Sequence, residues 1–248
     1  MVIHCVALLR MKFLKILEMR EAIVLAGGKG TRLRSVVTKV PKPMAPVAGR
    51  PFLEYILDRL IDFRFTHVIL SVGYKAEQII NYFGENYLSL SISYAIEKLP
   101  LGTGGAIKMC LQKINSKSVL ILNGDTYAEL NYDEMFDLNL KYNSIVIGCV
   151  EVDDVYRYGA LEVEQGYLRN LNEKGAFGPG IINAGCYILN KHEFLNLPKK
   201  TIFSFEKDYL QKIVNKSAIN VHVSEGKFID IGIPDDYFYA QNFFNEKH

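Results

Sequence analysis

Residues whose chemistry suits phosphate gather in a glycine-rich segment near the start of the chain. An apolar run, residues 21–25, leads directly into the segment 26–33, AGGKGTRL. A strand that ends in such a turn presents backbone N–H groups to phosphate oxygens, and glycines let the backbone approach a ligand closely. Arg32 adds a planar, permanently charged guanidinium that matches phosphate geometry. The segment predicts a nucleotide-binding loop with these contact residues: Leu25, Ala26, Gly27, Gly28, Gly30, Thr31 and Arg32.

Two common nucleotide loops are excluded by the order of residues. A Walker A loop needs a lysine after its last glycine, but Lys29 precedes Gly30. A dinucleotide fingerprint needs a third glycine where this chain has Leu33. The glycines alone also suit an ordinary strand-to-helix turn. The rigid, cationic Pro41-Lys42-Pro43 that follows favours the nucleotide loop instead.

Two acidic residues stand where a metal ligand would be expected. Asp125 follows Gly124 at the end of the apolar run 118–123, and Asp230 interrupts a second apolar run before Gly232. Mg²⁺ in proteins is held by one or two carboxylates together with phosphates and water. Asp125 could instead simply begin a turn, whereas an unpaired acid buried at Asp230 would be costly. On the residues alone, Asp125 and Asp230 are candidate magnesium ligands, with a turn at Asp125 as the alternative.

The order of these motifs resembles that of the sugar-1-phosphate nucleotidyltransferases, over about residues 20–245. The resemblance implies that Asp125 and Asp230 hold Mg²⁺ on the phosphates of a nucleoside triphosphate. Arg32 would hold the departing pyrophosphate, and Lys42 would neutralise charge at the α-phosphate. The expected catalytic residues are thus Arg32, Lys42 and Asp125, and no side-chain nucleophile is required.

The resemblance also assigns the base and sugar sides of the site. Glu97, Gly102, Thr103 and Gly124 would border the nucleotide, although the glycine cluster 102–105 by itself suits a helix N-terminus. A carboxylate at Glu97 favours guanine, which offers two adjacent donors. The residues expected at the sugar phosphate are Gly159, Glu173, Lys174 and Asn183. Lys174 read alone could be an ordinary loop lysine beside Glu173.

Within this family, the segments 42–46, 123–126, 204–208 and 228–234 are most similar to those of guanylyltransferases of D-glycero-α-D-manno-heptose 1-phosphate. The expected reaction joins GTP to that sugar phosphate, giving a sugar nucleotide and pyrophosphate; such sugar nucleotides supply surface polysaccharide. Transfer of another base, or to mannose 1-phosphate, stays open, as does a regulatory subunit that binds sugar nucleotides without catalysis. That subunit would be expected to lack Arg32, Lys42 or one of the acids, and this chain has all four.

Composition restricts the class of protein. The 248 residues carry a net charge of +2 and no long basic run, which argues against a nucleic-acid partner. Cys110, Cys149 and Cys186 lie among apolar neighbours, as expected of small core residues in a reducing cytoplasm. No apolar run is long enough to span a membrane. The oligomeric state stays open, a homo-oligomer included.

The pattern of apolar residues predicts an α/β fold, with a Rossmann-like, mainly parallel sheet flanked by helices. Residues 66–72 and 118–123 are expected as buried strands, 52–63 and 107–114 as helices, and Asn131 as a helix cap. We expect one domain over 19–248, with a nucleotide lobe (19–150) and a smaller antiparallel sugar lobe (151–248) laid over it. Residues 1–18 are expected to lie outside the core, so that their deletion would leave activity and stability almost unchanged.

Overall fold

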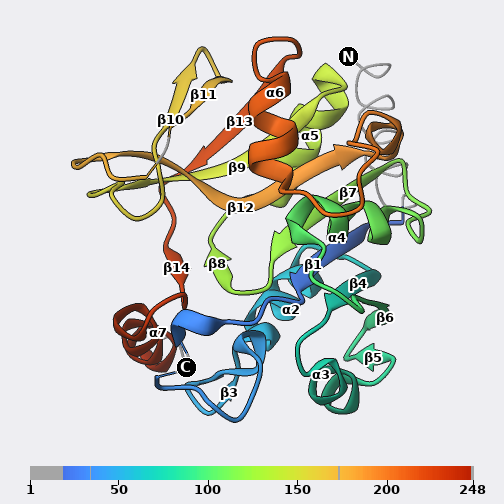
Figure 1. Ribbon diagram of the computed structural model, residues 1–248, viewed down its shortest axis with the longest axis vertical. Coiled ribbons are helices and arrows are strands. Elements are labelled where there is room, and N and C mark those ends of the chain that lie inside the picture. Colours follow the sequence, from blue (N-terminus) through green and yellow to red (C-terminus); the bar gives the residue numbers. More distant parts are fainter. Residues whose placement is uncertain (1–18, 34, 173, 247–248) are drawn as a thin grey trace, which may run out of the picture.

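The computed structural model describes residues 19–33, 35–172 and 174–246. Its main feature is a sheet of ten strands in the order β10-β11-β13-β9-β12-β7-β1-β4-β6-β5 (Figure 1). These strands are β1 (Glu21–Ala26), β4 (His67–Val72), β5 (Asn86–Tyr87), β6 (Leu90–Ile96), β7 (Ser118–Asn123), β9 (Ile145–Val152), β10 (Leu161–Glu164), β11 (Tyr167–Leu171), β12 (Gly180–Asn190) and β13 (Ile219–Ser224).

The remaining elements are short strands and helices. Two small sheets pair β2 (Pro46–Val47) with β3 (Arg50–Pro51) and β8 (Thr126–Ala128) with β14 (Phe228–Asp230). The α-helices are α2 (Phe52–Asp62), α3 (Ala76–Phe83), α4 (Gly102–Leu111), α5 (Tyr132–Tyr142), α6 (Gln211–Ile213) and α7 (Pro234–Glu246). Short 3₁₀ turns cover Thr31–Leu33, Lys42–Met44 and Lys191–Leu195, and a π-helix covers Phe205–Leu210.

The parallel centre of the sheet was predictable because its strands are buried on both faces. β1 lies between β4 and β7 and is parallel to both. Ala22 and Val24 of β1 pack into the core on one face, which α2 also enters, whereas Ile23 packs on the other face with α4. Such double burial requires nearly continuous apolar residues, so the strand predictions for 66–72 and 118–123 are confirmed to within one residue.

Two local predictions can be compared directly with the structure. Asn131 caps α5, because its Oδ1 accepts hydrogen bonds from the N–H groups of Asp133 and Glu134 at 3.1 and 3.3 Å. The helix expected at 107–114 instead begins at Gly102 and ends at Leu111. It begins earlier because the glycine cluster packs its backbone against Phe203, as described below.

The strands β9 to β13 continue the same ten-stranded sheet and are not laid over it. β12 pairs antiparallel with β7, which extends the parallel centre, and β9 and β13 follow beyond it. Figure 1 shows β14 and β8 below β9 and β12, with α7 beside β14. This part of the sheet, antiparallel except where β13 runs parallel to β9, is therefore joined to the nucleotide half through one continuous set of hydrogen bonds.

Some expectations concern features beyond the sheet. Cys110, Cys149 and Cys186 are free and buried, as predicted. Among the residues that the structure describes, no helix is both long and apolar enough to cross a membrane. The expectations for residues 1–18 and for Glu173 lie outside the described residues.

Candidate active site

Asp125 and Asp230 are brought together by the pairing of β8 with β14. Asp125 immediately precedes β8, and Asp230 ends β14 opposite Thr126. The N–H of Ile231 also donates to the Asp125 carbonyl at 3.1 Å, which continues the contact past the strand ends. Two acids from distant parts of the chain therefore share one edge, as their expected role as joint metal ligands requires.

Lys42 joins this pair from a third segment. It lies in the 3₁₀ turn between Pro41 and Pro43, and its Nζ lies 2.7 Å from Asp125 Oδ2 and 3.4 Å from Asp230 Oδ1. Only 8% of the Lys42 side chain is exposed. Burial raises the pKa of Asp230, the Lys42 ammonium opposes that shift, and the Asp125 carboxylate adds to it. The three side chains therefore form one coupled charged cluster.

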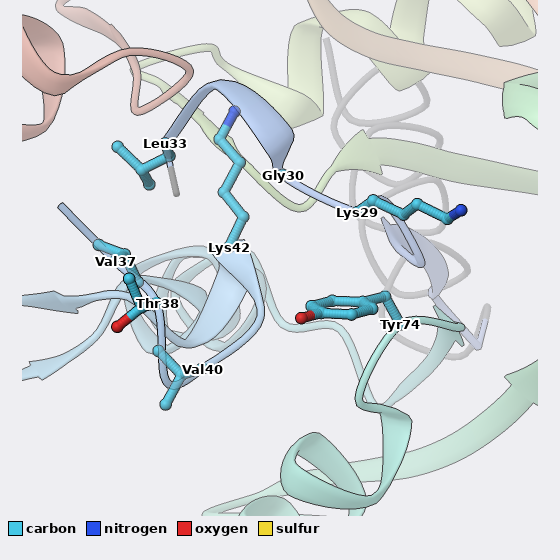
Figure 2. Close-up of a pocket in the computed structure, with 8 residues that line it drawn as sticks. All are labelled: Lys29, Gly30, Leu33, Val37, Thr38, Val40, Lys42 and Tyr74. Atoms are coloured by element: carbon cyan, nitrogen blue, oxygen red, sulfur yellow. The ribbon is translucent and has the colours of Figure 1, made fainter. Parts of the chain in front are cut away.

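The glycine loop lies over this cluster. Gly30 adopts a φ of +57°, and a Cβ at this position would come within 2.9 Å of Lys42 Cβ, so both conformation and space require glycine. Figure 2 shows the ammonium end of Lys42 rising toward the segment that carries Gly30 and Leu33, whereas the Lys29 side chain extends away. The loop thus approaches Lys42 through backbone and not through a second lysine.

A cavity of about 210 Å³ opens between the loop and the charged cluster. A Cβ on Gly28, which borders it, would meet no atom within 4 Å. Gly124 packs against β1, and its N–H donates to the Leu25 carbonyl at 2.9 Å. The structure brings together in this cavity most of the residues expected at the triphosphate, with Pro43 and Gly232 added: Leu25, Ala26, Gly28, Gly30, Thr31, Arg32, Lys42, Pro43, Asp125 and Gly232.

The side chain of Glu97, which follows the end of β6, packs against Gly27. Its Oε1 accepts from Ser71 Oγ at 3.0 Å and its Oε2 accepts from the Leu101 N–H at 3.1 Å. A Cβ on Gly27 would lie 2.2 Å from Oε1, so Gly27 is needed to admit this carboxylate. These contacts fix the orientation of Glu97, and each of its oxygens has further capacity to accept a donor.

The glycines of cluster 102–105 are used for packing. The N–H groups of Gly104 and Gly105 both face the Phe203 carbonyl, with N–O distances of 3.0 and 3.4 Å. A Cβ on Gly102 would lie 2.5 Å from that same carbonyl oxygen. This packing accounts for the glycines without a ligand, so a base lying flat on Gly102 stays a prediction.

A second cavity, of about 510 Å³, is bordered by Asp230. It is also bordered by Gly159, Lys174 and Asn183, the described residues expected at the sugar phosphate, and by Thr103, which was expected at the nucleotide. Arg157, next to the cavity residue Tyr158, forms a bidentate ion pair with Asp236 of α7, with N–O distances of 3.0 and 2.5 Å. The charged cluster therefore borders two cavities, with Lys42 and Asp125 at the first and Asp230 at the second.

Glu206 borders the larger cavity, and no role was predicted for it from the sequence. Its carboxylate accepts hydrogen bonds from Thr103 Oγ1 at 2.7 Å, Ser204 Oγ at 2.8 Å and Tyr187 OH at 2.9 Å. Asn183 Nδ2 in turn donates to the Tyr187 oxygen at 2.8 Å. Burial raises the pKa of Tyr187, which keeps its hydroxyl a donor. Glu206 thus connects the first turn of α4 with Tyr187 of β12, and in the sequence only the similarity of the segment 204–208 pointed to this region.

Comparison with known proteins agrees with this arrangement. The model of the family described as nucleotidyl transferase matches residues 21–247. The chain belongs to the nucleotidyl transferase family. The match covers the glycine loop, Lys42 and both acids of the charged cluster.

Within the nucleotidyl transferase family, the chain is 43% identical over 222 residues to the D-glycero-alpha-D-manno-heptose 1-phosphate guanylyltransferase of Aneurinibacillus thermoaerophilus, covering 89% of this chain and 96% of that relative. It is 40% identical over 220 residues to the enzyme of the same name from Campylobacter jejuni, with 88% and 97% covered. HddC from Yersinia pseudotuberculosis, solved in complex with GMP-PN, is 41% identical with a TM-score of 0.81, covering 91% of this chain and 100% of that one.

The donor set of the charged cluster suits Mg²⁺ bound together with a nucleotide. Among the described residues there is no group of three or more His, Cys, Asp or Glu side chains arranged to hold a metal. Two carboxylates that already share one cation, the Lys42 ammonium, match a site in which phosphates and water complete the shell.

Proposed function

We propose that this chain transfers a guanylyl group from GTP to D-glycero-α-D-manno-heptose 1-phosphate and releases pyrophosphate. The observation that carries the proposal is the placement of Asp125, Lys42 and Asp230 between two cavities. In-line attack of a sugar phosphate on the α-phosphorus needs the attacking oxygen and the departing pyrophosphate on opposite sides of that phosphorus, with a centre beside them that neutralises the charge of its oxygens. The choice of guanine and heptose rests on the similarity to the two heptose 1-phosphate guanylyltransferases.

The smaller cavity is assigned to the triphosphate, mainly on the 19–150 half, and the larger one to the sugar phosphate, mainly on 151–248. In the first, loop N–H groups and Arg32 would hold the departing pyrophosphate, and Lys42 would neutralise charge at the α-phosphate. In the second, Lys174 would hold the attacking phosphate beside Asn183. Asp125 and Asp230 would hold Mg²⁺, which when bound polarises the α-phosphate. We further infer a cytoplasmic enzyme whose product supplies surface polysaccharide.

The test is pyrophosphate release from each of four nucleoside triphosphates with a panel of sugar 1-phosphates, in Mg²⁺. GTP with the heptose 1-phosphate is expected to give the highest kcat/KM. Preference for UTP, dTTP or mannose 1-phosphate would correct the substrate. Binding without pyrophosphate release from any pair would show a regulatory subunit.

The chemistry assigned to Asp125 has its own test in Asp125→Ala. Loss of transition-state charge stabilisation of about 4 kcal/mol would lower kcat roughly 10³-fold. Asp62→Ala, which removes an exposed acid at the end of α2, is the matched control. If the Asp125 variant, folded by circular dichroism, kept a near-normal rate, the metal assignment would be wrong.

A further inference from the structure

We propose that Lys42 holds the place of the divalent cation between Asp125 and Asp230 until the nucleotide binds, so that metal and triphosphate enter the site together. The inference rests on the proposed metal-dependent function, and it concerns the order in which ligands bind. Its first support is geometric, because the Lys42 ammonium contacts one oxygen of each carboxylate, at 2.7 and 3.4 Å. An ammonium in that position occupies the space between the two carboxylates that a shared metal cation would need.

The backbone that carries Lys42 is held firmly, whereas its side chain can move. Pro41 and Pro43 flank the residue, the Ala45 N–H donates to its carbonyl at 3.0 Å, and Met44 N–H donates to the Pro41 carbonyl at 2.8 Å. Lys42, whose side chain has three further carbons beyond Cβ, borders the triphosphate cavity. Rotation about the bonds of this side chain would move the ammonium away from the carboxylates and into the triphosphate cavity, without moving the backbone.

Charge decides which ligand comes first. Two carboxylates with one ammonium carry a net charge of −1, whereas the carboxylates alone carry −2. A free divalent cation must therefore enter a site that is half neutralised and already holds a positive group with 8% of its side chain exposed. A triphosphate changes this balance, because it offers the ammonium a new anionic partner and brings its own metal. Metal alone should bind weakly, and metal with nucleotide strongly.

The experiment is a titration of Mn²⁺ against the full-length protein, with free Mn²⁺ read from its electron paramagnetic resonance signal. Wild type, Lys42→Met and Lys29→Met are compared without nucleotide and then with GMP-PN. Without nucleotide we expect Lys42→Met to bind Mn²⁺ at least tenfold more tightly than wild type. Lys29→Met removes a nearby lysine that points away from the cluster, and it should match wild type.

A double variant, Lys42→Met with Asp125→Asn, shows whether the gained affinity belongs to the carboxylates, and it should return to weak binding. Thermal unfolding gives an independent readout: Mn²⁺ alone should raise the Tm of Lys42→Met more than that of wild type. Equal Mn²⁺ affinity in wild type and Lys42→Met, with nucleotide-dependent binding intact, would overturn the inference. If the double variant binds Mn²⁺ as tightly as Lys42→Met, both without and with GMP-PN, the proposed metal site itself fails.

Discussion

At the level of single residues, the cations around the triphosphate cavity are not equivalent. Arg32 borders this cavity, whereas the Lys29 side chain extends away from Lys42 (Figure 2). Arg32→Ala is therefore expected to lower kcat/KM for GTP by about tenfold to a hundredfold, since it removes a charge-assisted contact to phosphate. Lys29→Ala should change it less than threefold. Equal losses in steady-state assays would mean that the pyrophosphate is held by another cation.

Glu97 is the residue to which we assign the choice of base. Its carboxylate is oriented by Ser71 and Leu101, and we expect its free acceptor sites to pair with N1–H and N2 of guanine. Loss of a charge-assisted pair costs roughly 2–3 kcal/mol. Glu97→Gln should thus weaken GTP use by about one to two orders of magnitude, and UTP use less. Measuring kcat/KM for both triphosphates decides it, because an unchanged ratio would place the base elsewhere.

At the level of elements, the sequence predicted the strands and the helix cap that a local pattern of residues determines. The parallel strands followed from their apolar runs, and the cap at Asn131 followed from its own side chain. The pairing of β8 with β14 could not be predicted, because it depends on where the chain returns after β13. The sequence predicted Asp125 and Asp230 as site residues, but their position around Lys42 follows only from this strand pairing. Glu206 was missed for the same reason, since two of its three donors, Thr103 and Tyr187, come from other segments of the chain.

The early start of α4 can be tested through Gly105. In an isolated helix, Ala would be more stable than Gly by about 1 kcal/mol. Here a Cβ on Gly105 would lie 2.3 Å from the Thr201 carbonyl oxygen, a backbone atom that cannot rotate away. Gly105→Ala should therefore lower the free energy of unfolding by about 1–3 kcal/mol, measured in urea. Gly28→Ala, where a Cβ meets open space, is the control and should leave stability nearly unchanged. A more stable Gly105→Ala protein would show that the contact relaxes freely.

At the level of the whole molecule, the site depends on the register of β1 with its neighbours β4 and β7. This register is held at the ends of these strands that lie away from the site. Glu21, at the start of β1, is fully buried. Its Oε2 accepts from the N–H groups of Asn115 and Ser116 before β7, and its Oε1 lies 2.9 Å from His67 Nδ1 in β4. One carboxylate thus connects β1 with both of its neighbours in the sheet, while Asp125 lies beyond the other end of β7.

The contribution of Glu21 to stability should depend on pH. Burial raises the pKa of Glu21, but the hydrogen bonds from Ser116, His67 and Asn115 outweigh it, so the folded pKa lies below its ordinary value. The carboxylate therefore stabilises the fold above the unfolded pKa of about 4.3, and this stabilisation is lost as pH falls through the folded pKa. Glu21→Gln should cost about 2–3 kcal/mol in urea unfolding at pH 7. The difference from wild type should shrink below about pH 4.

The control for this prediction is Glu77→Gln, which changes an exposed acid on α3 and should match wild type at each pH. A Glu21→Gln deficit that stays constant from pH 7 to pH 3 would mean that the side chain acts through packing and not through its charge. Because Glu21 lies at the far end of the sheet, kcat per folded molecule should be unchanged in the variant. A fall in kcat with full folding would instead show that strand register at Glu21 controls the spacing of the charged cluster.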